Sequence, residues 1–420
     1  MIVLFNDSLG EFGGSHTLML RMCRWLRAHD VTVGVLCISD SNTEIVGAMQ
    51  QIGVSIEVVG NYDLKRLHNS VKKYYTKDVD VKIINLYLGK WLDIECVKRK
   101  YNIPVQNILY DIHPETFYKG AGLPLKILRN YAKWEFRRIA KKIYRNSAII
   151  SMEETNIKSA REYLIIKNPD DYNPMILRLP MICERKNNYE DIIRKGFESN
   201  VIMAAARADF PYKGYLMGLV EDFASLKENF PNIKLCLVVA GHDMSLLKGK
   251  INSFANYIKK DIKIHGWLTY SELLSEMQNC KVFVGMGTTI LDAALQYKPV
   301  VSAAFNTLEN KTCGLFSDNP FTLGPIENEC HFSLNDLKSI LDLDYKQYSE
   351  QCKRSFETVF THYNIDKMMP ALLEQMPKTN KTILSMLEIK EHQISLLINK
   401  YRYKNKTDKN DFSEVAASNK

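Results

Sequence analysis

The chain has 420 residues, of which 46% are hydrophobic and 25% are charged. This length exceeds what one hydrophobic core usually supports, so we expect two globular domains, and the composition excludes disorder as the main state. The formal net charge of +8 is concentrated in residues 119–145, while basic and acidic residues alternate elsewhere, which argues against nucleic-acid binding.

The nine cysteines indicate neither a disulfide framework nor a zinc site. They are odd in number, include no Cys-x-x-Cys pair and mostly lie in apolar runs. A reducing, cytoplasmic environment fits this pattern best. The first residues, MIVLFNDSLGEFGG, lack a basic region and predict a first strand in place of a signal peptide. No apolar run approaches the length of a membrane span.

In the first half of the chain, apolar runs rich in Val and Ile alternate with helical patterns. This alternation is typical of parallel sheets built from right-handed crossovers. The expected strands are 2–5, 31–37, 55–59, 81–86, 105–110 and 148–151. The expected helices are 15–28, 43–51, 64–75, 92–101 and the basic segment 119–145. Together they predict an N-terminal doubly wound domain, residues 1–180.

A Pro- and charge-rich interval at 167–199 is expected to connect this domain to a second one, and it carries one apolar piece at 175–179. The expected strands of the second domain, residues 181–344, are 201–206, 234–240, 262–265, 282–284 and 300–302. Its expected helices are 215–230, 244–257, 270–278 and 289–297. Ligands bind at the carboxyl ends of such strands, so we expect a cleft between the domains.

After the second domain the sequence is helical. Residues 345–376 are long enough to cross back over the first domain. Residues 377–420 contain one amphipathic helix, 383–401, which is a candidate for self-association, and then a polar tail that we expect to be disordered.

The basic segment 119–145 has nine basic residues and one acidic residue, Glu135, together with apolar residues at near-helical spacing. This pattern predicts a basic amphipathic helix. Its charged face either is simply solvated or contacts an anionic membrane surface, which would make the protein peripheral on the inner face of the plasma membrane.

Two segments indicate a diphosphate-sugar site. Arg207 and Lys213 lie in RADFPYKG after a buried strand, where a planar guanidinium and an ammonium group can clamp two phosphates. The second segment, GMGTTILD at 285–292, opens a helix that presents N–H groups and a positive dipole end to the same anion. Asp292 can then accept hydrogen bonds from ribose hydroxyls. The alternative without a ligand is that Arg207 and Lys213 are ordinary loop-exposed charges and that residues 285–292 form only a tight turn from strand to helix.

With IHGWLTYSELLSEMQNCKVFV and ALQYKPVV, these motifs resemble the GT-B glycosyltransferases, specifically the large retaining family that includes sucrose synthase and bacterial capsule and lipopolysaccharide glycosyltransferases. The resemblance covers roughly residues 1–376 and is strongest over 201–303. It implies an α/β GT-B fold, with two Rossmann-like doubly wound parallel-sheet domains facing a cleft and a C-terminal helical extension. The N-terminal domain would bind the acceptor and the C-terminal domain the nucleotide sugar.

The resemblance also implies roles for individual residues. His113, Arg207 and Lys213 match catalytic positions, with His113 facing the transferred sugar. Residues matching donor-binding positions are Gly13, Gly14, Gly241, Gly285, Gly287, Thr288, Thr289 and Asp292. The weaker acceptor-binding candidates are His16, Asp111 and Glu115. Residues 266–268 match the stretch that contacts the base, although Trp267, as a Trp that follows a strand, is more often a core residue.

The chain departs from the family at Val284, where the family has the first of two glutamates. Two functions therefore stay open. One is a retaining, metal-independent hexosyltransferase that moves sugar from a UDP- or GDP-linked donor to a glycan or lipid-linked acceptor, with no further cofactor, in surface polysaccharide biosynthesis. The other is a catalytically silent GT-B protein that binds nucleotide or glycan as a partner subunit. A dinucleotide-dependent dehydrogenase is disfavoured, because NDSLGEFGG lacks Gly-x-Gly-x-x-Gly.

Overall fold

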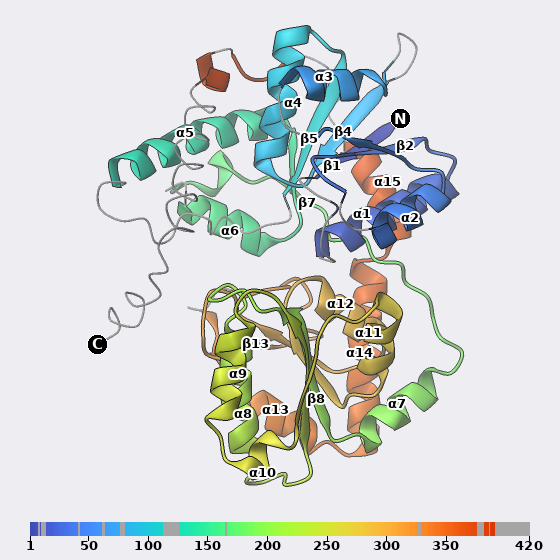
Figure 1. Cartoon of the computed structure of the whole chain (residues 1–420), viewed down its shortest axis with the longest axis vertical. Coiled ribbons are helices and arrows are strands. Elements are labelled where there is room, and N and C mark those ends of the chain that lie inside the picture. The colour runs from blue at the N-terminus through green and yellow to red at the C-terminus, as the bar shows by residue number, and fades with distance from the viewer. Residues whose placement is uncertain are drawn as a thin grey trace.

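The structure is a computed structural model that describes residues 1–6, 9, 14–40, 43–60, 64–75, 80–111, 126–163, 166–325, 329–375, 382–385 and 387–390. Side chains at 126–133, 135, 136, 163 and 375 are outside this description. The chain forms two α/β domains, one above the other in Figure 1. None of the described helices is long and apolar enough to cross a membrane.

The N-terminal domain is built on a seven-stranded sheet with the order β3-β2-β1-β4-β5-β6-β7, in which every paired strand is parallel. The strands are β1 Ile2–Phe5, β2 Val33–Cys37, β3 Ser55–Val58, β4 Val81–Asn85, β5 Val105–Asp111, β6 Ile149–Ser151 and β7 Met175–Ile176. The helices are α1 Gly14–Ala28, α2 Thr43–Gln51, α3 Leu64–Lys72, α4 Leu88–Tyr101, α5 Lys126–Arg145 and α6 Glu154–Tyr163. Strands β1, β2 and β5 are buried along their whole length, because helices cover both faces of a doubly wound sheet.

The C-terminal domain repeats this order in a second sheet, β10-β9-β8-β11-β12-β13-β14. Its strands are β8 Val201–Arg207, β9 Lys234–Ala240, β10 Ile262–His265, β11 Val282–Gly285, β12 Val300–Ala303, β13 Lys311–Leu315 and β14 His331–Phe332. Its helices are α7 Tyr189–Glu198, α8 Tyr215–Leu226, α9 Met244–Asn252, α10 Asn256–Lys259, α11 Tyr270–Gln278, α12 Thr288–Leu295 and α13 Leu334–Leu341. Two doubly wound sheets of this kind confirm the predicted GT-B fold class.

Several elements differ from the prediction. Helix α7 lies inside the interval predicted as a connection, and it forms because Ile192 and Ile193 pack into the core on one face of a charged segment. Strand β13 pairs antiparallel with β12, and β14 pairs antiparallel with β13; neither strand was predicted. Their sequence, KTCGL and HF, lacks the Val- and Ile-rich run that marks the parallel strands. Helix α6 was also missed.

The helical segment predicted at 345–376 forms two helices, α14 Tyr345–His362 and α15 Ile365–Gln375. Helix α14 packs on α12 and α7, whereas α15 packs on α1 in the other domain, as Figure 1 shows. At the break between them, Met181 N–H donates to the Tyr363 carbonyl at 2.7 Å and Ile365 N–H donates to the Met181 carbonyl at 2.8 Å. The two connections between the domains therefore lie side by side.

Part of the predicted helix 383–401 is described, and it packs on the N-terminal domain. Leu384 and Ile389 are buried in an apolar cluster with Trp91, and Ile383 N–H donates to the buried carboxylate of Glu95 at 2.9 Å. These apolar side chains are therefore used within the chain and are not free for a second copy. The rest of 383–401 and the predicted disordered tail lie outside the described residues.

Candidate functional site at the domain interface

A cavity of about 460 Å³ opens between the two domains. Its walls come from the carboxyl ends of strands in both sheets, the position where doubly wound sheets bind ligands. The residues used below that line it are Gly14, His16, Glu153, Arg207, Lys213, Gly266, Trp267, Leu268, Tyr270, Gly287, Thr288, Thr289 and Asp292. Sequence motifs far apart in the chain are therefore brought to one site.

Two cations, Arg207 and Lys213, line one wall of the cavity. Among the described residues, neither side chain makes a hydrogen bond or an ion pair within contact distance. Burial, together with the neighbouring Arg207, lowers the pKa of Lys213 to about 8, while Asp209 opposes this shift. Two adjacent cations without a bound partner, of which Lys213 is partly desolvated, form a site suited to an anion with two negative groups.

The loop that carries these cations is held by its neighbours. Phe210 N–H donates to the Asp243 carboxylate at 2.7 Å, and Lys213 N–H donates to the Asp209 carbonyl at 2.7 Å. On the other side, Asn306 N–H donates to the Tyr212 carbonyl at 3.1 Å. The loop backbone that carries the two cations is thus held before any ligand binds, which lowers the entropic cost of binding.

The N-terminus of α12 forms a second wall. Gly287 precedes the helix with φ +69°, a backbone conformation that favours glycine, and its N–H donates to the Leu323 carbonyl at 2.6 Å. Thr288 and Thr289 follow and line the cavity. Across the interface, a Cβ added to Gly14 would lie 2.8 Å from the Thr288 hydroxyl oxygen. The domains touch here without room for a larger residue at position 14.

Asp292 lines the cavity and is tied to the opposite domain. Its Oδ1 accepts from Arg21 of α1 at 2.7 Å and from the Tyr270 hydroxyl at 2.8 Å. Burial disfavours the Arg21 cation, but Asp292 and Tyr270 outweigh this cost and raise the pKa of Arg21. Within the described chain, Oδ2 of Asp292 accepts no hydrogen bond. One carboxylate oxygen holds the domains together, and the other is available to a ligand.

Arg21 and Tyr270 were not predicted as site residues. The signal for Arg21 was present, because it shares helical spacing with the apolar residues Leu18, Met22 and Trp25. An arginine within an apolar stripe needs a buried partner. The sequence gives no indication of which acidic residue that partner is.

Glu153 was also missed. It lies two residues after the end of β6 and is 2% exposed in the cavity wall, and its Oε2 accepts from Leu323 N–H of the other domain at 2.9 Å. Burial raises the pKa of Glu153 to about 8, against the opposing effects of the Leu323 N–H and Arg178. The acid is thus largely protonated at neutral pH. An acidic residue within two positions of the end of a predicted strand was the signal that could have identified it.

Replacing Glu153 with Gln should raise the melting temperature relative to wild type, and more so as pH rises from about 5 to about 8. Because the pKa of Glu153 is raised in the folded protein, the folded protein keeps a proton in this pH range that the unfolded chain releases. The contribution of Glu153 to the free energy of unfolding of wild type therefore falls as pH rises across this range. Glutamine mimics the protonated acid and loses this dependence. Melting curves of both proteins at several pH values check this, and a constant difference would contradict it.

The other predicted residues divide into three groups. His16 and Trp267 line the cavity, and Trp267 is 53% exposed, so it is not the core residue that its position after a strand suggested. Asp111, Gly241 and Gly285 are not part of the lining, although Gly241 and Gly285 adjoin lining residues in sequence and the Asp111 carbonyl accepts from the N–H of the lining residue Met152 at 3.0 Å. Gly13, His113 and Glu115 lie outside the described residues. Val284 is fully buried in β11, so that position presents no polar group to the cavity.

No protein-family model matches the sequence, and no curated protein matches it. The fold is similar to those of several solved structures. Anabaena HepE, in complex with UDP and glucose, matches with a TM-score of 0.63 and 14% identity, over 89% of this chain and 98% of HepE. A Rickettsia africae glycosyltransferase matches with a TM-score of 0.59 and 15% identity, over 92% and 99% of the two chains.

A mutant of Staphylococcus aureus TarM, in complex with fondaparinux, alpha-GlcNAc-glycerol and UDP, matches with a TM-score of 0.61 and 11% identity, over 89% of this chain and 99% of that one. At such identities the likeness is one of fold. The chain therefore has the two-domain GT-B fold, with its largest set of predicted site residues gathered in the cavity between the domains.

Proposed function

We propose that this protein is a glycosyltransferase that moves a sugar from a nucleotide-diphosphate donor, UDP- or GDP-linked, to a glycan or lipid-linked acceptor. The observation that carries the proposal is the unpaired cation pair Arg207 and Lys213 in the interdomain cavity of a GT-B fold. HepE and TarM, which have similar folds, were solved with UDP. Surface polysaccharide biosynthesis is the process we propose, by analogy of fold alone.

Each wall of the cavity has a part in this proposal. Arg207 and Lys213 bind the two phosphates, and the N–H groups at the start of α12 face the same anion. Oδ2 of Asp292 accepts from the ribose hydroxyls, and the exposed ring of Trp267 stacks on the base. The acceptor enters from the N-terminal domain, past His16.

We propose that transfer retains the configuration at the anomeric carbon. The bond from this carbon to the diphosphate oxygen breaks, and its electron pair stays on the diphosphate. The acceptor hydroxyl oxygen bonds to the carbon on the same face and gives its proton to the departing diphosphate oxygen. The protein's part is to stabilise the charge that develops on the diphosphate, through the two cations, and to hold the acceptor in the interdomain cavity.

The proposal is tested by measuring UDP or GDP release from a panel of nucleotide sugars. Wild type should release one nucleoside diphosphate, and Arg207→Ala/Lys213→Ala should not. If wild type binds a nucleotide but never turns over any donor with glycan or lipid-linked acceptors, the protein is the catalytically silent GT-B subunit. Val284 favours that second candidate, because the family's first glutamate is missing.

Replacing Trp267 with Ala should weaken nucleotide binding by about 5- to 150-fold, since base stacking on an aromatic ring contributes about 1–3 kcal/mol. The side chain is 53% exposed, so its loss should leave the fold intact. Titration calorimetry with UDP and GDP measures the effect. Tyr257→Ala, at a ring that is 60% exposed and is not in the cavity lining, is the matched control. Equal affinities for both variants would rule out the stacking role.

We also propose that α5 contacts an anionic membrane surface that holds the acceptor. Trp134 of α5 is 52% exposed, with the Arg138 guanidinium 4.9 Å from its ring centre. An exposed Trp beside basic residues is typical of a helix at a membrane interface. In sedimentation with anionic vesicles at low salt, wild type should be found in the vesicle pellet and Trp134→Ala in the supernatant. Absence of wild type from the vesicle pellet would end this proposal.

A further inference from the structure

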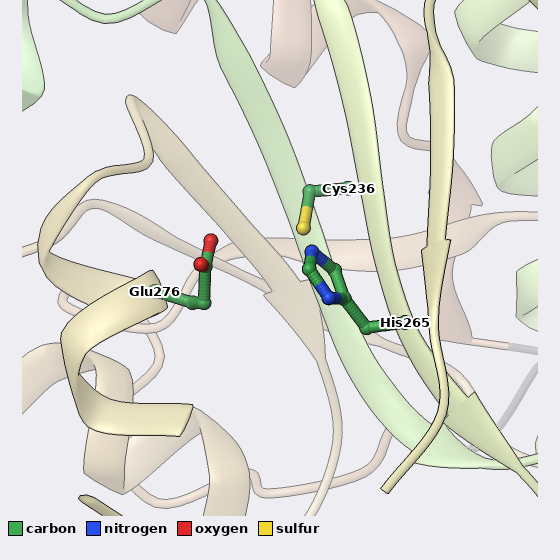
Figure 2. A group of neighbouring side chains, drawn as sticks. All are labelled: Cys236, His265 and Glu276. Carbon is green, nitrogen blue, oxygen red and sulfur yellow. The ribbon is translucent and has the colours of Figure 1, made fainter. Parts of the chain in front are cut away.

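Three metal-ligating side chains converge next to the cavity in the C-terminal domain. They are Cys236 of β9, His265 at the end of β10 and Glu276 of α11. One ligand atom from each lies within 4.8 Å of the other two. Figure 2 shows the thiol and the imidazole pointing toward one another from neighbouring strands, with the carboxylate facing them from the helix. None of the three is part of the cavity lining.

The donor set is typical of one kind of ion. A thiolate sulfur, an imidazole nitrogen and a carboxylate oxygen are the ligands that Zn²⁺ takes, usually four in a tetrahedron. Ligand atoms in such a site lie roughly 3.5 Å apart, so the three groups need to close by about 1 Å. Glu276 is only partly buried, on a long side chain of a surface helix, and a change of its rotamer can supply this movement.

His265 gives a second, independent indication. Its Nε2 atom is buried, and within the described part of the chain it has no hydrogen-bond partner. A buried polar nitrogen without a partner is costly, and most such groups in proteins are satisfied. A metal ion bound to this nitrogen would satisfy it. Ordinary packing of a thiol against a ring gives no account of the unpaired nitrogen.

We propose that Cys236, His265 and Glu276 bind one divalent transition-metal ion of the Zn²⁺ type, with a water molecule as the fourth ligand. The sequence predicted no zinc site, because the three residues are far apart along the chain and only the sheet order brings them together. Binding requires the thiol to lose its proton and so releases a proton to solvent.

The position of the site defines its role. Strand β10 is the edge strand of its sheet, and the residues that follow His265, Gly266 to Leu268, line the cavity. An ion shared by β9, β10 and α11 fixes that wall and the start of α11, where Tyr270 reaches Asp292. The ion is a positioning element and touches neither Arg207 nor Lys213. The inference does not depend on the proposed glycosyltransferase activity.

Cobalt titration of the full chain, first treated with a chelator and then freed of it, tests the site directly. Co²⁺ bound to a thiolate gives a charge-transfer absorption and, in tetrahedral geometry, strong visible bands. Wild type should bind one equivalent with these bands, and Zn²⁺ should displace it. Cys236→Ser should lose the charge-transfer band, and His265→Gln and Glu276→Gln should bind at least about tenfold more weakly.

Cys313→Ser is the matched control, because Cys313 is a partly buried thiol on β13, toward the opposite edge of the same sheet. It should keep the wild-type spectrum. Absence of the bands in wild type, or their persistence in Cys236→Ser, would overturn the inference. If Cys236→Ser does not fold, Glu276→Gln decides the question: at the same Zn²⁺ concentration, the melting temperature of chelator-treated wild type should rise more than that of this variant, and an equal rise would overturn the inference.

Discussion

Replacing Arg21 with Met should lower the free energy of unfolding by about 3–5 kcal/mol, which is the usual effect of removing one partner of a buried ion pair. The Arg21 guanidinium lies 2.7 Å from Asp292 and 3.0 Å from the Tyr270 hydroxyl, and the Arg21 and Asp292 side chains are 7% and 5% exposed. Without Arg21, the Asp292 carboxylate stays buried with only Tyr270 as a donor. This pair therefore contributes strongly to the stability of the interdomain contact.

Denaturant unfolding of wild type, Arg21→Met and the double variant Arg21→Met/Asp292→Leu measures this contribution. The double variant should recover part of the loss, since no uncompensated charge then remains in the interface. Arg24→Met is the control, because Arg24 is exposed on the same helix. It should stay within about 0.5 kcal/mol of wild type. An equal effect of the Arg21 and Arg24 substitutions would show that the Arg21–Asp292 pair does not stabilise the contact between the domains.

The second large effect is expected from Arg207→Ala/Lys213→Ala, which should weaken binding of nucleoside diphosphates by roughly 100-fold or more. Hydrogen bonds to charged groups contribute about 1.5–3 kcal/mol each, and this variant removes both cations that face the cavity. The unliganded protein should be no less stable than wild type, because in the described residues neither cation pairs with another group. Lys248→Ala, at an exposed lysine of the same domain, is the matched control.

Binding should also depend on pH through Lys213. Its pKa in the free protein is about 8, so the cation is present at pH 7 and is lost as pH rises past 8. The affinity of wild type for a nucleoside diphosphate should accordingly fall between pH 7 and pH 9. Lys213→Arg, whose side chain stays charged, should lose most of this dependence. An unchanged affinity of wild type over this range would show that Lys213 does not bind the anion.

The fold, and the place of Arg207 and Lys213 at the end of a strand, were predictable because the sequence patterns that indicate them are local. Alternating strands and helices define the two sheets, and RADFPYKG and GMGTTILD each follow a buried strand, where the fold brings ligands. The contacts between the two domains were not predictable. The contacts of Arg21 with Asp292 and of Glu153 with Leu323 join residues that only the packing of one domain on the other brings together.

The same reasoning explains the remaining misses. Helix α7 carries too few apolar residues to stand out from a charged interval, and strand β13 is a short stretch without β-branched aliphatic residues. Cys236, His265 and Glu276 follow no spacing motif, because each lies on a different element and their proximity results from the order of the sheet. Local patterns predict elements, whereas contacts between distant elements require the fold.

The most direct test of the central claim is calorimetric titration of wild type and Arg207→Ala/Lys213→Ala with UDP, GDP and the corresponding monophosphates. We predict that one diphosphate binds wild type at a single site, that its monophosphate binds much more weakly, and that the double variant binds the diphosphate roughly 100-fold or more weakly than wild type does. If no nucleoside diphosphate binds wild type, or if the double variant binds as tightly as wild type, the cavity between the domains is not a nucleotide-diphosphate site.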